Sequence, residues 1–145
     1  MIYTDKTRKA LSICYEAHKD SWDKSGAPYV FHPFHVAEQM KDEVTTVVAL
    51  LHDVVEDSGY TLEMLKEAGF DQDVIEAIAL LTRTEDVRTD EEYLAYVMRI
   101  KENPIARVVK IADLTHNADL RRLPVVKDKD IMRAAKYQRA LLLLQ

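Results

Sequence analysis

The sequence predicts an all-α protein of about seven or eight helices, because apolar residues recur with helical spacing and nowhere alternate convincingly as in a strand. Only 3 Gly and 4 Pro are present, too few for the many tight turns of a β-sandwich or barrel. The 145 residues, of which 48% are hydrophobic, suffice for one core but not for two. We therefore expect a single domain covering residues 1–145.

The most informative stretch is VTTVVALLHDVVED, residues 44–57, which predicts one helix with a continuous apolar face. Apolar side chains recur there at i, i+3, i+4, i+7 and i+11, namely Val44, Val47, Val48, Leu51 and Val55. Additional apolar residues widen that face until the segment is expected to be buried on most sides.

Four polar residues interrupt this apolar helix: His52, Asp53, Glu56 and Asp57. Helical spacing puts Glu56 one turn from both His52 and Asp53. Burying three carboxylates and an imidazole so close together is costly unless a cation or hydrogen bonds compensate them. For Glu56 and Asp57 alone, a solvated helix end is the simplest interpretation. For the His52-Asp53 pair, inside the apolar run, metal ligation is an equal alternative.

Helices on the N-terminal side are predicted over about 4–19 and 33–41. Thr4 or Asp5 can cap the first, and Pro33 suits the first turn of the second. Residues 20–33, DSWDKSGAPYVFHP, lack helical spacing and carry a turn signal, so they form a candidate binding loop.

Downstream of residue 57, Thr61 caps a short helix that runs to Ala68 and that Gly69 closes. Apolar spacing places two more helices over about 74–81 and 90–100, separated by a charged loop.

Asn103-Pro104 is a strong start signal for the next helix, with Asn as cap and Pro in the first turn. A last helix opens at Asp128 or Asp130, and its inward face is expected to consist of Ile131, Ala134, Ala135 and Leu142. The terminal run 141–144, LLLL, exceeds one helical face. The chain end therefore either docks into the core or supports a homodimer.

Composition excludes several classes of partner. A net charge of −5 disfavours binding to nucleic acid polymers or to anionic membranes, which reward clustered Lys and Arg. The single cysteine, Cys14, has no internal partner for a disulfide. The N-terminus has no apolar signal region, and no run approaches membrane-spanning length. We expect a cytoplasmic protein.

Residue types that bind metals occur at three separated places: His32, the His52-Asp53 pair, and Asp113 with its neighbours His116 and Asn117. A single inward His or Asp is usually a hydrogen-bonded core residue. Three segments that each direct nitrogen or oxygen ligands inward are harder to explain as packing. Two imidazoles and two carboxylates without a thiol cluster suit Mn²⁺, Fe²⁺ or Zn²⁺.

Several motifs appear in a fixed order along the chain: KSGAPY at 24–29, HP at 32–33, ALLHDVVED at 49–57, and KIAD at 110–113 followed by HN at 116–117. Together they resemble the HD-domain metal phosphohydrolases, and within them the Rel/Spo-type (p)ppGpp hydrolase domain. The resemblance covers about residues 17–123. It implies an HD-type helical bundle and, because no synthetase half is visible, a small stand-alone alarmone hydrolase.

The resemblance also implies roles for individual residues. The implied ligands of one divalent ion, typically Mn²⁺, are His32, His52, Asp53 and Asp113. The residues implied to orient the attacking water and to move protons are Glu56 and Asp57. The residues implied to contact the nucleotide are Lys24, Ser25 and Asn117. The reaction implied is removal of the 3′-pyrophosphate from (p)ppGpp.

Two positions depart from the family pattern. Asp23 stands where members usually have Arg, and Leu114 replaces a basic residue after the last metal Asp. Both changes remove positive charge from the expected polyphosphate pocket. They favour, as an alternative, another nucleotide substrate, such as a nucleoside monophosphate or the 2′-phosphate of NADPH. A further alternative is a non-catalytic nucleotide-sensing module.

Three other histidines and two aromatic residues have less defined expectations. His35 and His116 are expected to orient ligands or to pack, and His18 suits packing as well as substrate contact. Tyr29 is expected to pack within the loop. Trp22 is a candidate for stacking on a base, without a defined expectation.

Overall fold

The structure is a computed structural model that describes all of residues 1–145. It contains nine α-helices and one 3₁₀ helix, and its only extended pairing is an isolated bridge between Trp22 and Pro28. In the first half lie α1 (Asp5–His18), α2 (Phe31–Glu38), α3 (Glu43–Leu51), α4 (Val54–Asp57) and α5 (Leu62–Glu67). In the second half lie α6 (Gln72–Leu81), α7 (Asp90–Lys101), α8 (Pro104–Asn117), η1 (Leu120–Arg122) and α9 (Asp128–Leu144). The all-α prediction is confirmed.

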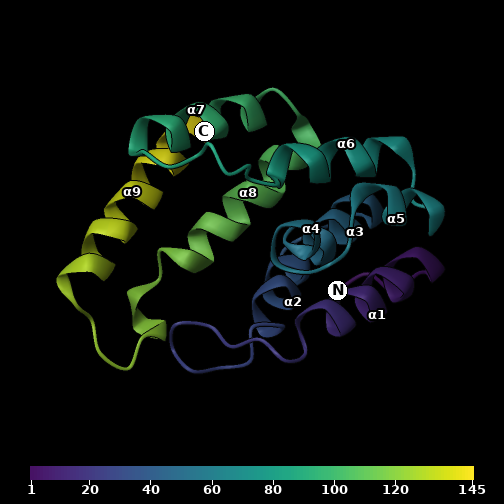
Figure 1. The fold of residues 1–145 in the computed structure, drawn as a ribbon, viewed down its shortest axis with the longest axis horizontal. Coiled ribbons are helices and arrows are strands. Elements are labelled where there is room, and N and C mark those ends of the chain that lie inside the picture. Colours follow the sequence, from purple (N-terminus) through teal and green to yellow (C-terminus); the bar gives the residue numbers. More distant parts are fainter.

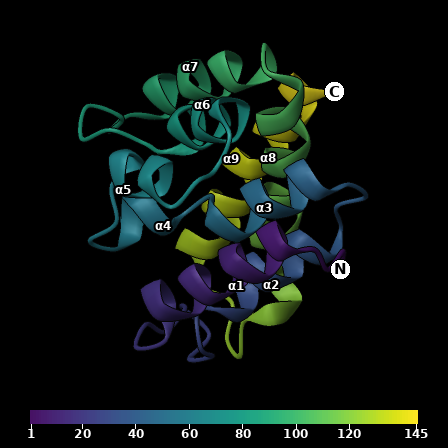
Figure 2. The same ribbon diagram turned by 90° about the vertical axis from the view of Figure 1, so that its right-hand side faces the viewer.

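Helix α3 is the centre of the core, because every residue from Thr45 to Leu51 is buried. It packs against α1 and α2 on one side and against α6 and α8 on the other. Helix α8 in turn contacts α9, so that α1 and α9 lie at opposite sides of the molecule (Figure 1). After a quarter turn, α9 is seen behind α8 and α3 (Figure 2). No helix combines the length and apolarity needed to cross a membrane.

Most predicted helix boundaries are confirmed by their caps. Thr4 forms a capping box with Thr7, Thr61 accepts a hydrogen bond from Met64 N–H, and Asn103 caps α8. Gly69 follows α5 with φ +97°, a left-handed conformation that glycine adopts without steric cost. Helix α7 is capped by Thr89 rather than by Asp90, which occupies the first helical position.

Two predicted helices differ from those observed. Helix α2 begins at Phe31, so Pro33 lies inside its first turn, where the missing N–H has no helical partner to lose. The predicted single helix over 44–57 is broken at His52-Asp53 into α3 and α4. The His52 ring contacts the carbonyl of Ala49, which an unbroken helix would pair with the N–H of Asp53.

The inward face predicted for α9 is largely wrong. Ile131, Ala135 and Leu142 are exposed, and of the four predicted residues only Ala134 is buried. The true inward face carries polar residues, because α9 forms one wall of a cavity described below. Leu144 is fully buried, so the chain end docks into the core.

Docking of the chain end predicts unequal effects for two neighbouring leucines. Leu144→Ala is expected to lower the free energy of unfolding by about 2–5 kcal/mol, because it leaves a cavity in the core. Leu142→Ala, with its side chain in solvent, is expected to change it by less than about 0.5 kcal/mol. Urea denaturation of both variants measures the difference, and equal losses would contradict the docking.

Candidate metal centre

Histidines and carboxylates from three elements converge next to α3: His32 on α2, the His52-Asp53 pair at the break, and Asp113 on α8. His32 Nε2 lies 2.9 Å from Asp113 Oδ1. His52 Nε2 lies 3.1 Å from Asp53 Oδ2 and 3.6 Å from Asp113 Oδ1. The four side chains therefore form one buried cluster, in which the ligand atoms of His32, His52 and Asp53 all lie within 4.8 Å of one another.

His52 is oriented so that one nitrogen faces this cluster. Its Nδ1 lies 2.6 Å from the carbonyl oxygen of Ala49, which can only accept a hydrogen bond, so the proton is on Nδ1. Nε2 is buried, without a hydrogen-bond partner, and directed at Asp53 and Asp113. Burial lowers the pKa of His52, but these two carboxylates raise it well above its usual value. A proton or a metal ion must therefore balance them.

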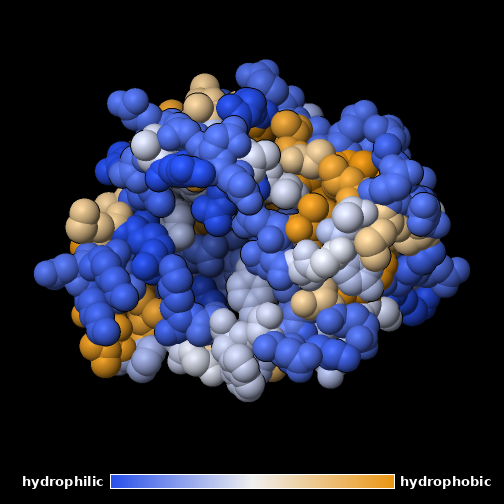
Figure 3. Space-filling view, viewed as in Figure 1, coloured by the Kyte–Doolittle hydropathy of each residue, from blue (hydrophilic) through white to orange (hydrophobic).

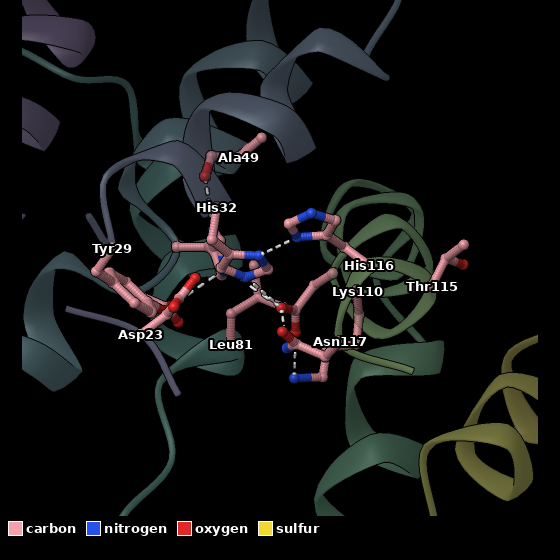
Figure 4. A network of polar contacts seen from close by, with 12 residues as sticks. Asp23, Tyr29, His32, Ala49, Leu81, Lys110, Thr115, His116 and Asn117 are labelled. Atoms are coloured by element: carbon pink, nitrogen blue, oxygen red, sulfur yellow. Dashed lines mark hydrogen bonds and ion pairs between the residues drawn. The ribbon is translucent and has the colours of Figure 1, made fainter. Parts of the chain in front are cut away.

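His32 is held from its other side by a stack of imidazoles. Its Nδ1 lies 2.7 Å from Nδ1 of His116, and the two rings are nearly parallel with centroids 5.0 Å apart (Figure 4). His35, which is exposed, stacks on the His116 ring with centroids 4.1 Å apart. The stack leaves Nε2 of His32 facing Asp113, so His116 and His35 orient the cluster from outside it.

Asp113 is enclosed by donors. Lys110 Nζ donates to Oδ2 at 2.8 Å, and Asn117 donates to Oδ1 at 2.9 Å (Figure 4). Burial raises the pKa of Asp113, but the Lys110 ammonium and the neighbouring imidazoles outweigh it and hold that pKa well below its usual value. The carboxylate is thus ionised, and available to a cation, at every physiological pH.

Asp53 receives a hydrogen bond from the hydroxyl of Tyr29, which comes from the loop before α2. Burial and the negative charge of Asp53 raise the pKa of Tyr29 far above its usual value, so the phenol keeps its proton and remains a donor. His18 is fully buried and packs on the Tyr29 ring at 5.0 Å. A packing role for His18 is what the structure supports.

The cluster fits a divalent ion. Two ligands at about 2.1 Å from a metal, at tetrahedral or octahedral angles, are about 3.0–3.5 Å apart. The observed separations of 2.9, 3.1 and 3.6 Å match that spacing. The unpartnered Nε2 of His52 is the kind of buried atom that a metal satisfies. The donor set of imidazole and carboxylate groups, without thiolate, suits first-row divalent ions.

A small inner cavity of about 120 Å³ adjoins the cluster. Glu56 and Asp57 of α4 line it together with Asp53 and Lys110. Glu56 is engaged by Arg83, whose backbone N–H and guanidinium donate to its two oxygens at 2.6 and 3.3 Å. Asp57 makes no such ion pair and keeps contact with water at the rim.

The protonation of Asp57 is shifted towards neutral pH. Loss of solvation through partial burial, followed by the charges of Asp53 and Glu56, raises the pKa of Asp57 to about 6. A carboxyl group with such a pKa can exchange protons near neutral pH.

A larger outer cavity of about 390 Å³ shares Tyr29, Arg83, Asn117 and Tyr137 with the inner one. Its other walls are the loop before α2, η1 and the inward face of α9. Figure 3 shows a hollow with mostly hydrophilic walls on this face of the molecule. The cavity is large enough for a small organic ligand, and the candidate metal cluster lies at its inner end.

No protein-family model matches the chain. A "Probable GTP pyrophosphokinase" of Mycobacterium leprae is 34% identical over 129 residues, which are 83% of this chain and 16% of that protein. A "Guanosine-3′,5′-bis(diphosphate) 3′-pyrophosphohydrolase" of Haemophilus influenzae is 34% identical over 116 residues, 72% of this chain and 17% of that protein. The bifunctional (p)ppGpp synthase/hydrolase SpoT of Escherichia coli is 28% identical over 77% of this chain and 17% of its own length.

One solved structure, described as a metazoan ortholog of SpoT that hydrolyzes ppGpp, has the same fold. It matches with a TM-score of 0.77 and 23% identity, over 99% of this chain and 94% of that one. The chain belongs to the Rel/Spo-type HD domains. It spans about one sixth of the length of the curated relatives it matches.

In this Rel/Spo-type HD domain, the residues expected to contact the nucleotide all line the outer cavity: Lys24, Ser25 and Asn117. Two of them also make internal contacts. The hydroxyl of Ser25 donates to Asp23 Oδ1 at 2.6 Å, and Asn117 donates to Asp113. Of the aromatic residues, Trp22 is 68% exposed at the rim of the cavity.

The two departures from the family pattern have different consequences. Asp23 lines the outer cavity, where Ser25 and Ala27 donate hydrogen bonds to it and Arg122 lies 3.4 Å away. Arg122, from η1, therefore neutralises the charge of Asp23, but the pair carries no net charge where the family pattern has a positive one. The expectation that Leu114 also removes charge from the pocket is wrong: Leu114 is fully buried in the core and lines neither cavity.

Sequence reasoning expected Tyr29 only to pack, included Lys110 only as part of the KIAD motif, and did not name Arg133. Lys110 had a local signal, because it precedes Asp113 by three residues on one helix. Tyr29 lies in the motif at 24–29, but nothing in the sequence indicates that its hydroxyl reaches Asp53. Arg133 had no signal, since it reaches the site from α9, which is distant in sequence.

The buried pair of Lys110 and Asp113 predicts a loss of stability when the cation alone is removed. Lys110→Met in metal-free buffer is expected to lower the free energy of unfolding by about 3 kcal/mol, because Asp113 would be left without its ammonium partner. Lys66→Met, which breaks a solvent-exposed pair with Glu63, is the control and is expected to cost less than about 1 kcal/mol. Urea denaturation compares the two, and a loss no larger than the control would contradict the role of the buried pair.

Proposed function

We propose that this Rel/Spo-type HD domain is a metal-dependent (p)ppGpp 3′-pyrophosphohydrolase. The observation that carries the proposal is the buried His/Asp cluster, which opens into a polar cavity large enough for a small ligand. The names of the relatives from Haemophilus influenzae and Escherichia coli support the substrate. Neutralisation of Asp23 by Arg122 means that Asp23 does not repel a polyphosphate ligand in this cavity as a free carboxylate would.

In this proposal His32, His52, Asp53 and Asp113 hold one divalent ion, and Mn²⁺ is our first choice. When bound, such an ion lowers the pKa of water and polarises a phosphoryl oxygen. The chain's own residues orient the ligands for it. Ala49 fixes the ring of His52, Tyr29 holds Asp53, and Lys110 holds the outer oxygen of Asp113.

The reaction breaks the bond between the 3′-oxygen and phosphorus. A water oxygen bonds to that phosphorus, the water gives up one proton, and the departing 3′-oxygen gains one. The products are pyrophosphate and GDP or GTP. Asp57 is the group best suited to take the proton from water, because its pKa of about 6 leaves it mostly ionised at neutral pH.

Glu56 has a different place in this scheme. Its contacts with the backbone and guanidinium of Arg83 fix the carboxylate at the wall of the inner cavity. We propose that it positions the water or the 82–89 loop while Asp57 carries the proton, so the two carboxylates that the family pattern pairs have separate tasks.

Turnover of ppGpp tests the function directly. With Mn²⁺ present, the protein is expected to release pyrophosphate from ppGpp and pppGpp, and Asp53→Ala is expected to reduce the rate by at least about 10³-fold, because it removes a ligand and the partner of Tyr29. The panel also includes NADPH and nucleoside monophosphates. Turnover of NADPH or nucleoside monophosphates alone would support the metal centre but show that the substrate is not ppGpp. Binding of Mn²⁺ and ppGpp with no turnover of any member would point to a sensor.

The raised pKa of Asp57 predicts the acid side of the pH profile. The ionised carboxylate is the form that accepts a proton, so kcat should rise with pH through about 6 and level off above it. Asp57→Asn should reduce kcat by about 10²–10⁴-fold and abolish that rise. A variant that keeps the wild-type profile would exclude Asp57 as the proton acceptor.

A further inference from the structure

The outer cavity is bordered by a concentration of cations, although the chain as a whole carries a net charge of −5. Lys24 reaches it from the loop before α2, Arg83 from the loop before α7, and Arg133 from α9. Lys136, three residues after Arg133 on the same helix, is not part of the lining, but the charges of Arg83 and Arg133 act on it, and its ammonium lies 4.7 Å from the centre of the Tyr93 ring. Three separate segments thus bring positive charge to one place.

These cations differ in how far acidic groups balance them. Arg83 is held by Glu56, and Arg133 has one contact with Asp130 at 3.3 Å. Lys24 and Lys136 form no ion pair within 4.0 Å. The group therefore retains unneutralised positive charge at the mouth of the site.

The like charges also act on one another. Burial, followed mainly by Arg133 among the neighbouring cations, lowers the pKa of Lys24. Burial lowers the pKa of Lys136, and Arg83, Arg133 and Arg139 lower it further against the opposing effect of Asp90. Such repulsion between cations in a concave site is relieved when an anion binds between them.

Charge is unequally distributed along the length of the site. The inner cavity is lined by four carboxylates and two cations, namely Asp53, Glu56, Asp57, Asp113, Arg83 and Lys110. The outer cavity is lined by four cations and three carboxylates, namely Lys24, Arg83, Arg122, Arg133, Asp23, Asp119 and Asp130, so its lining is the more positive of the two. A ligand that suits both ends has one phosphate group at the metal cluster and a second anionic group near α9. The inward face of α9 is polar for the same reason, since Asp130, Arg133 and Tyr137 occupy positions where a purely structural helix would have apolar side chains.

We propose that Arg133 and Lys136 of α9, together with Lys24, bind a second phosphate group of the substrate, remote from the phosphorus that reacts. The proposal rests on the proposed function for the identity of the ligand and assigns this subsite to its 5′-diphosphate. Arg133 supplies a guanidinium that can bind two phosphate oxygens at once, and Lys136 supplies an ammonium that forms no ion pair with a carboxylate.

The test compares two ligands that differ only at the 5′ end: ppGpp, and guanosine 3′-diphosphate with a free 5′-hydroxyl. Their dissociation constants are measured by calorimetry in EDTA, where no turnover interferes, with quenching of the single tryptophan, Trp22, as a second signal. Arg133→Met and Lys136→Met should each weaken binding of ppGpp about tenfold, the effect of one hydrogen bond to a charged group. Binding of the 5′-hydroxyl ligand should change less than about twofold.

Lys66→Met on α5 removes the same charge far from the cavity and is expected to change neither constant by more than about twofold. Equal losses for both ligands, no loss for either, or failure of the wild-type protein to bind ppGpp would overturn the subsite. With Mn²⁺ present, the α9 variants should raise KM for ppGpp and leave kcat unchanged.

The subsite and the proposed function fail independently. Selective loss of ppGpp binding in the two variants, with no pyrophosphate released by the wild-type protein, would retain the subsite and reject the hydrolase. Hydrolysis of ppGpp without that selective loss would retain the hydrolase and reject the subsite.

Discussion

Compensation of buried charge at the break between α3 and α4 is the constraint on which the rest of the site depends. His52 and Asp53 lie at the end of the most completely buried helix of the protein, where neither could remain without partners. Ala49 and Tyr29 supply hydrogen bonds to them, and Asp113 brings a second carboxylate together with its own cation, Lys110. What these contacts leave unsatisfied is one imidazole nitrogen directed at two carboxylates. That nitrogen and the two carboxylates make this place a candidate cation site.

The break in the central helix follows from the same constraint. A continuous helix over 44–57 would keep His52 in register with the apolar face and pair the carbonyl of Ala49 with a backbone N–H. The His52 ring forms a hydrogen bond with that carbonyl instead, so the helix is interrupted at Asp53. Glu56 and Asp57 of α4 then line the inner cavity. The two carboxylates then have different surroundings: Glu56 is paired with Arg83, and Asp57 is exposed to solvent.

In helix α9, the residues that face inward are set by the cavity that the helix lines. Its start and length agree with the sequence pattern, yet the apolar residues Ile131 and Leu142 face solvent while Arg133 and Tyr137 face the cavity. The cost of exposing apolar groups is modest, whereas a polar cavity needs charged groups in a particular place. The ion pair of Asp23 with Arg122 is another contact between distant segments, in which η1 supplies the cation that neutralises Asp23 of the loop before α2.

The sequence by itself determined that the protein is all-α, where most helices begin and end, and which residues form the candidate metal cluster. Those inferences rest on local spacing, on caps such as Thr4 and Asn103, and on motifs in a fixed order. Only the tertiary structure decided that the Tyr29 hydroxyl reaches Asp53 and that Arg83 donates hydrogen bonds to Glu56. It also decided that Leu114 belongs to the core and which face of α9 points inward. The reason is physical: each of these depends on how segments distant in sequence pack, and helical periodicity carries no information on the partner that a polar side chain meets across such a contact.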